Sequence, residues 1–244
     1  AWSQLPEGGL LIVSGEKKQG ADAVFKAVRA AATVDGSVSK AHGRLFWITV
    51  GADRPACLAE WQDAAAFTRN DAGYVTAPGM FSPDKVDAGS ALLADAFAGE
   101  LKGDIADLGA GWGWLSAQAL TSCPKVDSVT LFEAESKALK AARQNIDNPK
   151  AQFEWADATA LPARRLYDGV ICNPPFHKTR AADPELGKAF IAAAARCVKA
   201  SGTVWVVANR QLPYEAVLET HFHRWEELPG NGAFKLFRAR RPRT

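Results

Sequence analysis

The stretch Asp104-Ile-Ala-Asp-Leu-Gly-Ala-Gly-Trp-Gly113 decides the fold of this chain. Its first residues form a short β-prone run, and a helix is predicted directly after it, over Trp114–Thr121. The three glycines between them permit a tight turn and let the backbone approach a ligand closely beside a helix N-terminus. A sharp turn by itself would need only one glycine, so the pattern favours a strand–turn–helix unit that binds a nucleotide.

The same alternation of short strands and longer helices continues to the end of the chain. Strands are expected at Asp104–Asp107, Ser128–Phe132, Gln152–Trp155, Gly169–Cys172 and Thr203–Ala208, and helices at Ser136–Asn145, Pro184–Val198 and from about Pro213. Arg224–Leu228 and Phe234–Ala239 predict a closing antiparallel hairpin. This order predicts an α/β fold of the Rossmann-like kind, with a mostly parallel sheet covered by helices.

The first 70 residues show a different order of predicted strands and helices. Strands are expected at Leu10–Val13 and Leu45–Val50, with a helix over Ala21–Ala32 between them. This is one βαβ unit, which is small for an independent domain and is expected to pack on the main body. We therefore predict a partial N-terminal α/β subdomain over residues 1–70 and a main domain over residues 71–244.

The composition is that of an ordinary globular protein, with 48% hydrophobic and 23% charged residues among 244. These values exclude disorder, collagen-like repeats and coiled coil. The formal net charge is only +2, so a nucleic acid would have to bind a local patch. The four cysteines are too widely spaced for a zinc ribbon or a redox pair, and no apolar run is long enough to cross a bilayer. We expect a cytoplasmic protein without a metal site.

Acidic residues follow the first three predicted strands of the main domain. Asp107 ends the first strand, where a carboxylate has no packing role and can meet a cationic amine. Glu133 ends the second strand, 20 residues after Gly113, which is the position at which a carboxylate accepts from ribose hydroxyls. Asp157 follows the third strand and could accept from an adenine amino group, but a plain loop acid is an equal alternative.

Asn173-Pro-Pro-Phe176 follows the fourth strand. The two prolines fix the backbone at the carboxyl edge of the sheet, where open α/β sheets bind ligands. The Asn173 side chain and a proline carbonyl can together accept from the exocyclic amine of a base, on which Phe176 can stack. A plain turn is the alternative, but the acids between this segment and the glycine turn favour a site.

The glycine turn, the acids and the Asn-Pro-Pro-Phe segment together make residues 77–240 resemble a class I S-adenosylmethionine-dependent methyltransferase of the small-domain type. The chain most resembles the small-subunit ribosomal RNA guanine-N2 methyltransferase family. The resemblance lies in Pro78-Gly-Met-Phe-Ser82, Asp87-Ala-Gly-Ser90, Asp107-Leu-Gly-Ala-Gly-Trp-Gly-Trp-Leu-Ser116, Cys172-Asn-Pro-Pro-Phe-His177, Val207-Ala-Asn209, Leu212-Pro-Tyr214 and Phe234-Lys-Leu-Phe-Arg-Ala239. It implies a seven-stranded sheet with a reversed last strand, S-adenosylmethionine as cofactor and RNA as partner.

The resemblance also implies roles for individual residues. Those implied to bind the cofactor are Asp107, Gly109 and Gly111 at the methionine part, Glu133 at the ribose, Asp157 near the adenine, Phe81, Asp87 and Ser90 in the segment that covers it, and Asn173 beside the methyl group. Asn173, Pro174 and Phe176 are implied to hold the target guanine. Family members carry a complete, degenerate second copy of the fold at the N-terminus, of which residues 15–18 and 39–47 resemble the later portion.

Other interpretations stay open at this point. The target amine could belong to adenine in nucleic acid, a glutamine side chain or a small molecule, and a non-catalytic RNA-binding module is a further possibility. His177 is a weaker candidate for a general base, and Cys172 a weak one for a nucleophile. The arginines at 238, 240, 241 and 243 could contact phosphates or form a solvated tail.

Overall fold

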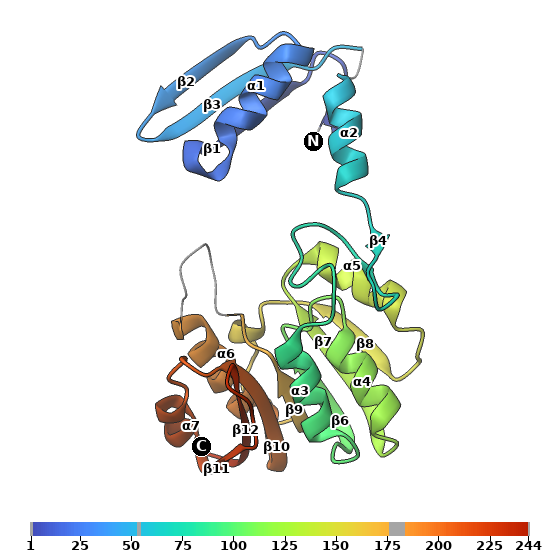
Figure 1. Ribbon diagram of the computed structural model, residues 1–244, viewed down its shortest axis with the longest axis vertical. Coiled ribbons are helices and arrows are strands. Elements are labelled where there is room, and N and C mark those ends of the chain that lie inside the picture. The colour runs from blue at the N-terminus through green and yellow to red at the C-terminus, as the bar shows by residue number, and fades with distance from the viewer. Residues whose placement is uncertain (1, 53–54, 176–183, 244) are drawn as a thin grey trace. The chain divides into compact units, whose positions relative to one another are not determined.

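The computed structural model describes residues 2–52, 55–175 and 184–243 (Figure 1). The chain divides into two compact units, Ala1–Ala66 and Phe67–Thr244. The first unit holds η1 (Trp2–Gln4), β1 (Leu10–Glu16), η2 (Lys17–Gln19), α1 (Ala21–Ala31), β2 (Gly36–Lys40), β3 (Gly43–Thr49) and α2 (Ala56–Ala64). The second holds β4 (Thr68–Arg69), β5 (Val75–Thr76), α3 (Ala88–Phe97), β6 (Gly103–Leu108), α4 (Trp114–Ser122), β7 (Val126–Glu133), α5 (Ser136–Asn145), β8 (Ala151–Trp155), η3 (Ala158–Ala160), β9 (Tyr167–Cys172), α6 (Pro184–Cys197), β10 (Val198–Asn209), α7 (Glu215–His221), β11 (Phe222–Leu228) and β12 (Phe234–Pro242).

The second unit is built on a seven-stranded sheet with the order β11-β12-β10-β9-β6-β7-β8. The strands from β8 to β10 pair in parallel, and β12 runs antiparallel to both β10 and β11. The last strand is thus the reversed one, and the predicted fold class is confirmed. The central strands β6 and β9 are each buried over their last four residues, so side chains on both faces of the sheet are covered there.

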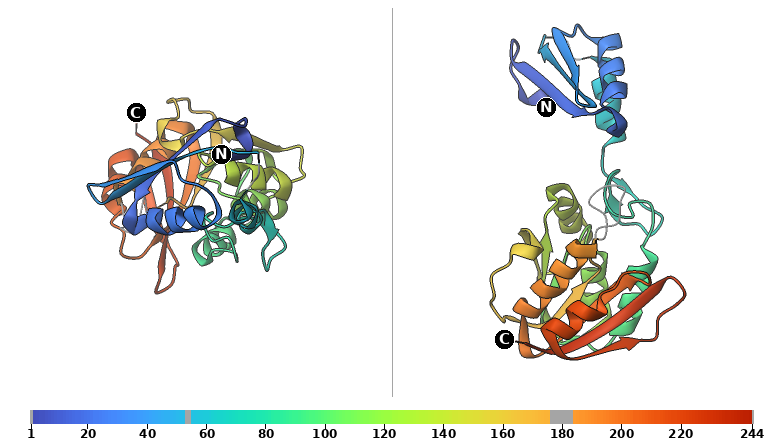
Figure 2. Two further views of the ribbon diagram at one scale, coloured as in Figure 1. Left: turned by 90° about the horizontal axis from the view of Figure 1, so that it is seen from above. Right: turned by 90° about the vertical axis from the view of Figure 1, so that its left-hand side faces the viewer.

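Helices cover both faces of this sheet (Figures 1 and 2). On one face α3, α4 and α5 pack on Ile105, Leu131 and Trp205, which belong to β6, β7 and β10. On the other face α6 and α7 pack on Leu108 and Val206. The carboxyl ends of the parallel strands consequently meet at one edge, between the two helical layers.

The first unit departs from the predicted βαβ arrangement. Its strands lie in the order β1-β3-β2, and β3 is antiparallel to both neighbours. The missed strand β2 joins β3 through a two-residue hairpin at Ala41 and His42, with φ of 48° and 61°. Such turns normally carry Asn or Gly, so these two residues gave no sequence signal. The unit has its own core, in which Phe25 and Val28 of α1 pack on Phe46 and Ile48 of β3.

Helix α3 was also missed by the prediction, although it places part of the site. Its buried residues Ser90, Leu93, Ala94 and Phe97 recur at helical spacing, and Asp87 forms the N-cap by accepting a hydrogen bond from the Ser90 amide at 2.7 Å. A capping residue followed by this spacing is the signal that could have revealed the helix. Over the described ranges, no helix combines the length and apolar character that a membrane span requires.

Candidate active site

A cavity of about 370 Å³ opens at the carboxyl edge of the sheet, beside the ends of β6, β7 and β9. Its volume lies within the range of about 300–1,000 Å³ that is typical of ligand pockets. Nine of the predicted site residues line it: Phe81, Asp87, Ser90, Gly109, Gly111, Glu133, Asp157, Asn173 and Pro174. The fold therefore brings together residues from five separate segments of the chain.

The glycine turn forms the floor of this cavity. Gly109, Gly111 and Gly113 have φ of 74°, 56° and 88°, in the left-handed region that glycine adopts without a steric penalty. A Cβ atom at Gly113 would lie 3.0 Å from the Ile146 side chain, so this glycine is also needed for helix packing. A Cβ atom at Gly111 would meet no atom within 4 Å, because that position faces open space. The turn thus presents bare backbone to the cavity.

Asp107 lies beneath the turn rather than in the cavity lining. It is fully buried, and its Oδ2 accepts a hydrogen bond from the Ser116 hydroxyl at 2.7 Å. Its Oδ1 has no hydrogen-bond partner in the described structure. Burial, reinforced by the negative charge of Glu133, raises the pKa of Asp107 to about 7, against the opposing effect of Ser116. An unpartnered carboxylate oxygen of this kind suits a cationic group that is brought close by a ligand.

Glu133 and Asp157 reach the cavity from the ends of β7 and β8. Glu133 accepts hydrogen bonds from the backbone amides of Gly111, at 2.8 Å, and Glu135, at 2.7 Å. These bonds fix the carboxylate against the glycine turn. The Asp157 carboxylate caps η3 through Thr159, and these hydrogen bonds hold the pKa of Asp157 below its ordinary value. Both carboxylates are therefore held in fixed positions as hydrogen-bond acceptors at the cavity wall.

The amide of Asn173 is held rigidly by two residues from α3. Its Nδ2 donates to Asp87 Oδ2 at 3.0 Å and to Ser90 Oγ at 2.8 Å, so both hydrogens of the side-chain NH₂ group are used. Because a carboxylate only accepts, Asp87 also determines which branch of the amide is the nitrogen. No described residue donates to the Oδ1 atom of Asn173. That oxygen is free to accept from a ligand.

A second, smaller cavity adjoins the first. Its volume is about 160 Å³, and it shares Phe81, Asp87, Asn173 and Pro174 with the larger one. Its remaining lining consists of Ala208, Asn209, Leu212 and Phe234, from β10, the segment after it, and the start of β12. Asn173 and Pro174 thus stand where the two cavities meet. This arrangement suits two ligands that react with one another across Asn173.

The segment that carries Phe81 is fastened to the glycine turn. The indole Nε1 of Trp112 donates to the Phe81 carbonyl at 2.9 Å. The side-chain amide of Asn145 exchanges hydrogen bonds with the Val75 backbone and donates to the Trp112 carbonyl at 2.9 Å. Asn145 was missed by the sequence reasoning, since a helix C-terminal asparagine gives no functional signal. It joins the covering segment to the cavity floor.

The cavity also has an apolar wall. Trp112 and Trp114, which the sequence suggests could edge a cofactor pocket, are part of it. The sequence did not single out its other members, which are Leu115, Phe132, Ala138, Leu186 and Phe190. Phe176 and His177 lie outside the described residues. Cys172 is buried and donates to the Leu108 carbonyl, and burial raises the pKa of its thiol well above the ordinary value. Burial of this kind favours the protonated thiol and therefore disfavours Cys172 as a nucleophile. The described parts of the chain contain no cluster of His, Cys, Asp and Glu suited to a metal ion.

Three features together define a class of protein, the S-adenosylmethionine-dependent methyltransferases. They are the reversed last strand, the glycine turn at the carboxyl edge and the acid at the end of β7. A family model described as the methyltransferase small domain matches residues 71–238. This chain belongs to that family and is a methyltransferase.

Curated relatives and a solved structure are similar to nearly the whole chain. The ribosomal RNA small subunit methyltransferase C of Klebsiella pneumoniae subsp. pneumoniae is 32% identical over 243 residues, which cover 97% of this chain and 68% of the relative. The protein of the same name from Erwinia tasmaniensis is 32% identical over 98% of this chain and 70% of its own length. The T. thermophilus 16S rRNA N2 methyltransferase, solved with AdoMet and guanosine, is 25% identical, with a TM-score of 0.75 over 99% of this chain and 67% of that one.

Proposed function

We propose that this enzyme transfers a methyl group from S-adenosylmethionine to the exocyclic N2 amine of a guanine in small-subunit ribosomal RNA. The observation that carries the proposal is the fixed Asn173 amide at the meeting point of two cavities, one large and one small. The named activity of the relatives, and the guanosine bound by the T. thermophilus enzyme, support this choice of substrate.

The residues of the larger cavity fit the cofactor. Asp107 lies beneath the cavity lining, and we assign its buried Oδ1, which has no hydrogen-bond partner among the described residues, to the ligand ammonium group. The bare backbone at Gly111 leaves room for the methionine part. We assign the ribose hydroxyls to Glu133 and the adenine amine to Asp157, with Phe132 and Ala158 beside the ring. Bound S-adenosylmethionine supplies a methyl group on a positively charged sulfur, which is already activated for transfer.

The protein's part in the reaction is positioning and electrostatic stabilisation. In the transfer the guanine N2 lone pair would form a bond to the methyl carbon while the carbon–sulfur bond breaks, S-adenosylhomocysteine would leave, and N2 would release one proton to water. Asn173 Oδ1 and the Pro174 carbonyl accept from the N2 hydrogens, which aims the amine along the transfer line. The same oxygens stabilise the positive charge that develops on N2.

The smaller cavity is assigned to the guanine ring. Phe81 and Phe234 offer ring faces for the base, and Asn209 offers hydrogen-bonding groups for its edge. A base inside a duplex must first leave the stack to enter, so an exposed guanine is the expected target. A ribosomal RNA substrate implies that the enzyme works in the cytoplasm. Its four cysteines are all free, which suits a reducing compartment.

The proposal is tested by incubating the enzyme with labelled S-adenosylmethionine and either protein-free small-subunit RNA or intact small subunits. Digestion to nucleosides should give label only in N2-methylguanosine. Label in N6-methyladenosine would assign the site to adenine instead, and transfer to protein or to small molecules alone would overturn the RNA assignment.

Replacing Asp107 by asparagine should stabilise the free enzyme and weaken cofactor binding. The folded-state pKa of about 7 lies above the ordinary value of 3.8, so the folded state binds more protons between these values. Stability is therefore lost as pH rises from 4 to 7, by about 4 kcal/mol in all. Denaturant titrations should show the Asp107→Asn variant more stable at pH 8 and equal to wild type at pH 3.5, with weaker S-adenosylmethionine binding by calorimetry. A variant that is less stable at pH 8 would contradict the buried-charge assignment.

We also propose that residues 71–244 are the methyltransferase domain and residues 1–70 a separate subdomain. The division into compact units after Ala66 and the start of the family match at residue 71 support this boundary. Limited proteolysis should cut the chain between residues 50 and 75 and leave a fragment that still binds the cofactor.

A further inference from the structure

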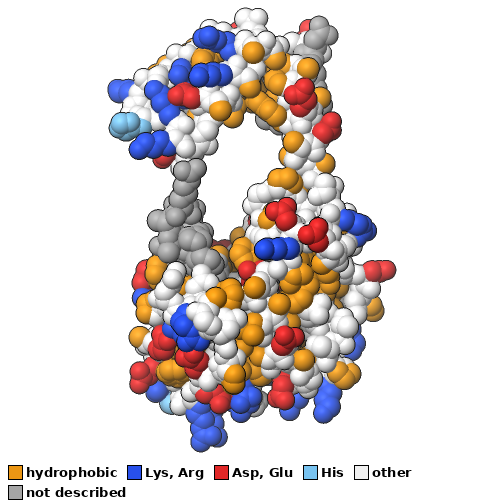
Figure 3. All heavy atoms as spheres, viewed as in Figure 1, with side chains coloured by type: hydrophobic (Ala, Val, Ile, Leu, Met, Phe, Trp, Pro, Cys, Tyr) orange, Lys and Arg blue, Asp and Glu red, His pale blue; other side chains and the backbone are white. Residues whose placement is uncertain are grey.

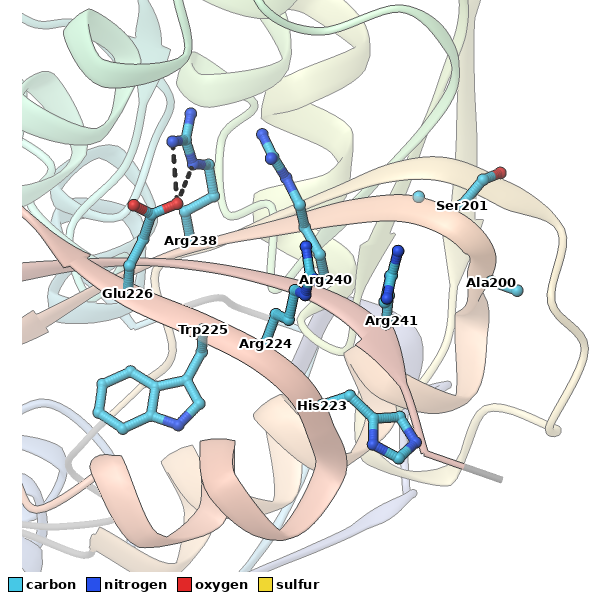
Figure 4. A pocket seen from close by; sticks show the side chains of 10 residues that line it. Ala200, Ser201, His223, Arg224, Trp225, Glu226, Arg238, Arg240 and Arg241 are labelled. Atoms are coloured by element: carbon cyan, nitrogen blue, oxygen red, sulfur yellow. Dashed lines mark hydrogen bonds and ion pairs between the residues drawn. The ribbon is translucent and has the colours of Figure 1, made fainter.

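A further recessed surface lies on the second unit, Phe67–Thr244, away from the two cavities. It is a groove of about 770 Å³ formed by β10, β11 and β12 (Figure 4). On β10 it is lined by Ala200, Ser201 and Gly202, at the end of that strand opposite to Asn209 and the smaller cavity. The groove is therefore at the amino edge of the parallel sheet, whereas the reaction takes place at the carboxyl edge.

The groove is strongly basic in a protein that is almost neutral overall. Its charged lining consists of Arg224, Arg238, Arg240 and Arg241 against Glu226 alone, a local balance of +3. Figure 3 shows Lys and Arg side chains projecting from the lower end of this unit, where Figure 1 places the C-terminus. The net charge of the whole chain is only +2. Positive charge is thus concentrated here, as a local anion-binding patch requires.

One of the four arginines already has its partners. Arg238 forms an ion pair with Glu226 at 2.9 Å and lies over the Trp205 ring. The other three are different, because no ion pair to Arg224, Arg240 or Arg241 occurs among the described residues. Their guanidinium groups are available to an external anion.

Arg224 and Arg240 are also placed directly opposite one another. They are Cα partners in the antiparallel β11–β12 ladder, so their side chains rise from the same face (Figure 4). Like charges at such a position repel one another and destabilise the sheet. An anion between them removes the repulsion, and the planar fork of two guanidinium groups matches the oxygens of a phosphate.

The backbone turns so that Arg241 joins this group. Successive side chains of a regular strand point to opposite faces, which would direct Arg241 away from Arg240. Arg241 instead has φ of 54°, a left-handed conformation that is unusual for a residue other than glycine. Both arginines consequently line the groove.

We propose that this groove binds the phosphodiester backbone of the RNA substrate, as an anchoring surface separate from the catalytic cavities. The inference rests on the proposed function, since an RNA substrate supplies the polyanion. The groove is lined along two paired strands by three arginines that have no ion pair among the described residues, and so suits a stretch of backbone rather than one small anion.

The test is the double variant Arg224→Gln/Arg240→Gln, which neutralises two exposed side chains without touching the packed Arg238. Its affinity for protein-free small-subunit RNA, measured by fluorescence anisotropy between 50 and 300 mM salt, should fall on the order of tenfold. The slope of log K against log salt should fall by about 2, one for each lost phosphate contact. The matched control is Lys125→Gln/Lys140→Gln, which removes two exposed charges outside the groove lining of the same unit and should change neither quantity.

Methyl transfer separates this inference from the proposed function. The KM for RNA should rise in the double variant, while calorimetric binding of S-adenosylmethionine and transfer to free guanosine at high concentration stay at wild-type values. Wild-type enzyme that binds RNA through the groove but methylates no guanine would overturn the proposed function alone. Unchanged RNA affinity and salt slope in the double variant would overturn the groove. So would a loss seen with intact small subunits but not with protein-free RNA, which would point to a protein partner.

Discussion

Replacing Asn173 by alanine should lower the turnover of methyl transfer by a factor on the order of 100 to 1,000, equivalent to about 2.7–4 kcal/mol. The expected loss is the size seen when one oxyanion-hole donor is removed from an enzyme. The two cases are alike because the amide oxygen of Asn173 would stabilise the positive charge that develops on the guanine amine. Single-turnover kinetics with saturating cofactor and RNA measure the effect directly. Calorimetry should show S-adenosylmethionine binding close to that of wild type, since other residues hold the cofactor.

A control separates this effect from a general loss of structure. Asn148→Ala removes an asparagine whose Oδ1 only accepts a local hydrogen bond from the Lys150 amide, and it should leave turnover unchanged. Asn173→Asp should be as slow as Asn173→Ala or slower, because it places a second carboxylate within hydrogen-bond distance of Asp87. Wild-type turnover in Asn173→Ala would remove the catalytic assignment.

The second large effect is expected from Asp87, which acts through Asn173. In Asp87→Ala the amide loses the acceptor that fixes its orientation, and a hydrogen bond to a charged group is worth about 1.5–3 kcal/mol. We expect turnover to fall on the order of 10- to 100-fold. The same change removes the N-cap of α3, which should cost about 1 kcal/mol of stability.

Two further variants keep positioning distinct from stability. Ala96→Gly in the same helix should cost about 1 kcal/mol as well, but it leaves the Asn173 contacts intact and should retain turnover. Asp87→Asn keeps a good capping residue and an acceptor oxygen, so it should recover stability fully and turnover in part. Equal turnover losses in Asp87→Ala and Ala96→Gly would show that Asp87 is merely structural.

These two residues also mark the limit of what the sequence could predict. The strand, glycine turn and helix around Gly109–Gly113 are local, so composition and periodicity were sufficient to predict them. The hydrogen bond between Asp87 and Asn173 joins residues 86 positions apart. The resemblance placed Asp87 in the segment that covers the cofactor, and the structure adds that its carboxylate holds the side-chain amide of the proposed catalytic residue.

The depth of Asp107 is a feature that the sequence could not predict. Its expected contact with a ligand amine stays a prediction. The structure adds that the side chain lies beneath the glycine turn, fully buried, with one oxygen on Ser116 and no partner for the other among the described residues. Periodicity places a residue at the end of a strand, but it does not determine how deeply the following turn covers it.

In the first unit, the order of strands could not be derived from spacing. A helix between two strands suggested a parallel βαβ unit, but the hairpin at Ala41 and His42 inserts an additional strand and reverses the next one. The turn adopts left-handed conformations without Asn or Gly. The strands on either side of the turn, β2 and β3, pair over five residues and hold it in this conformation.

The proposed reaction depends most on the position of the guanine amine relative to Asn173. A crystal structure of the enzyme with S-adenosylhomocysteine and guanosine tests this directly. We predict the base in the smaller cavity, between Phe81 and Phe234, with N2 within hydrogen-bond distance of Asn173 Oδ1 and the Asn173 nitrogen still on Asp87. A guanine bound elsewhere, or an amide turned away from it, would contradict the account.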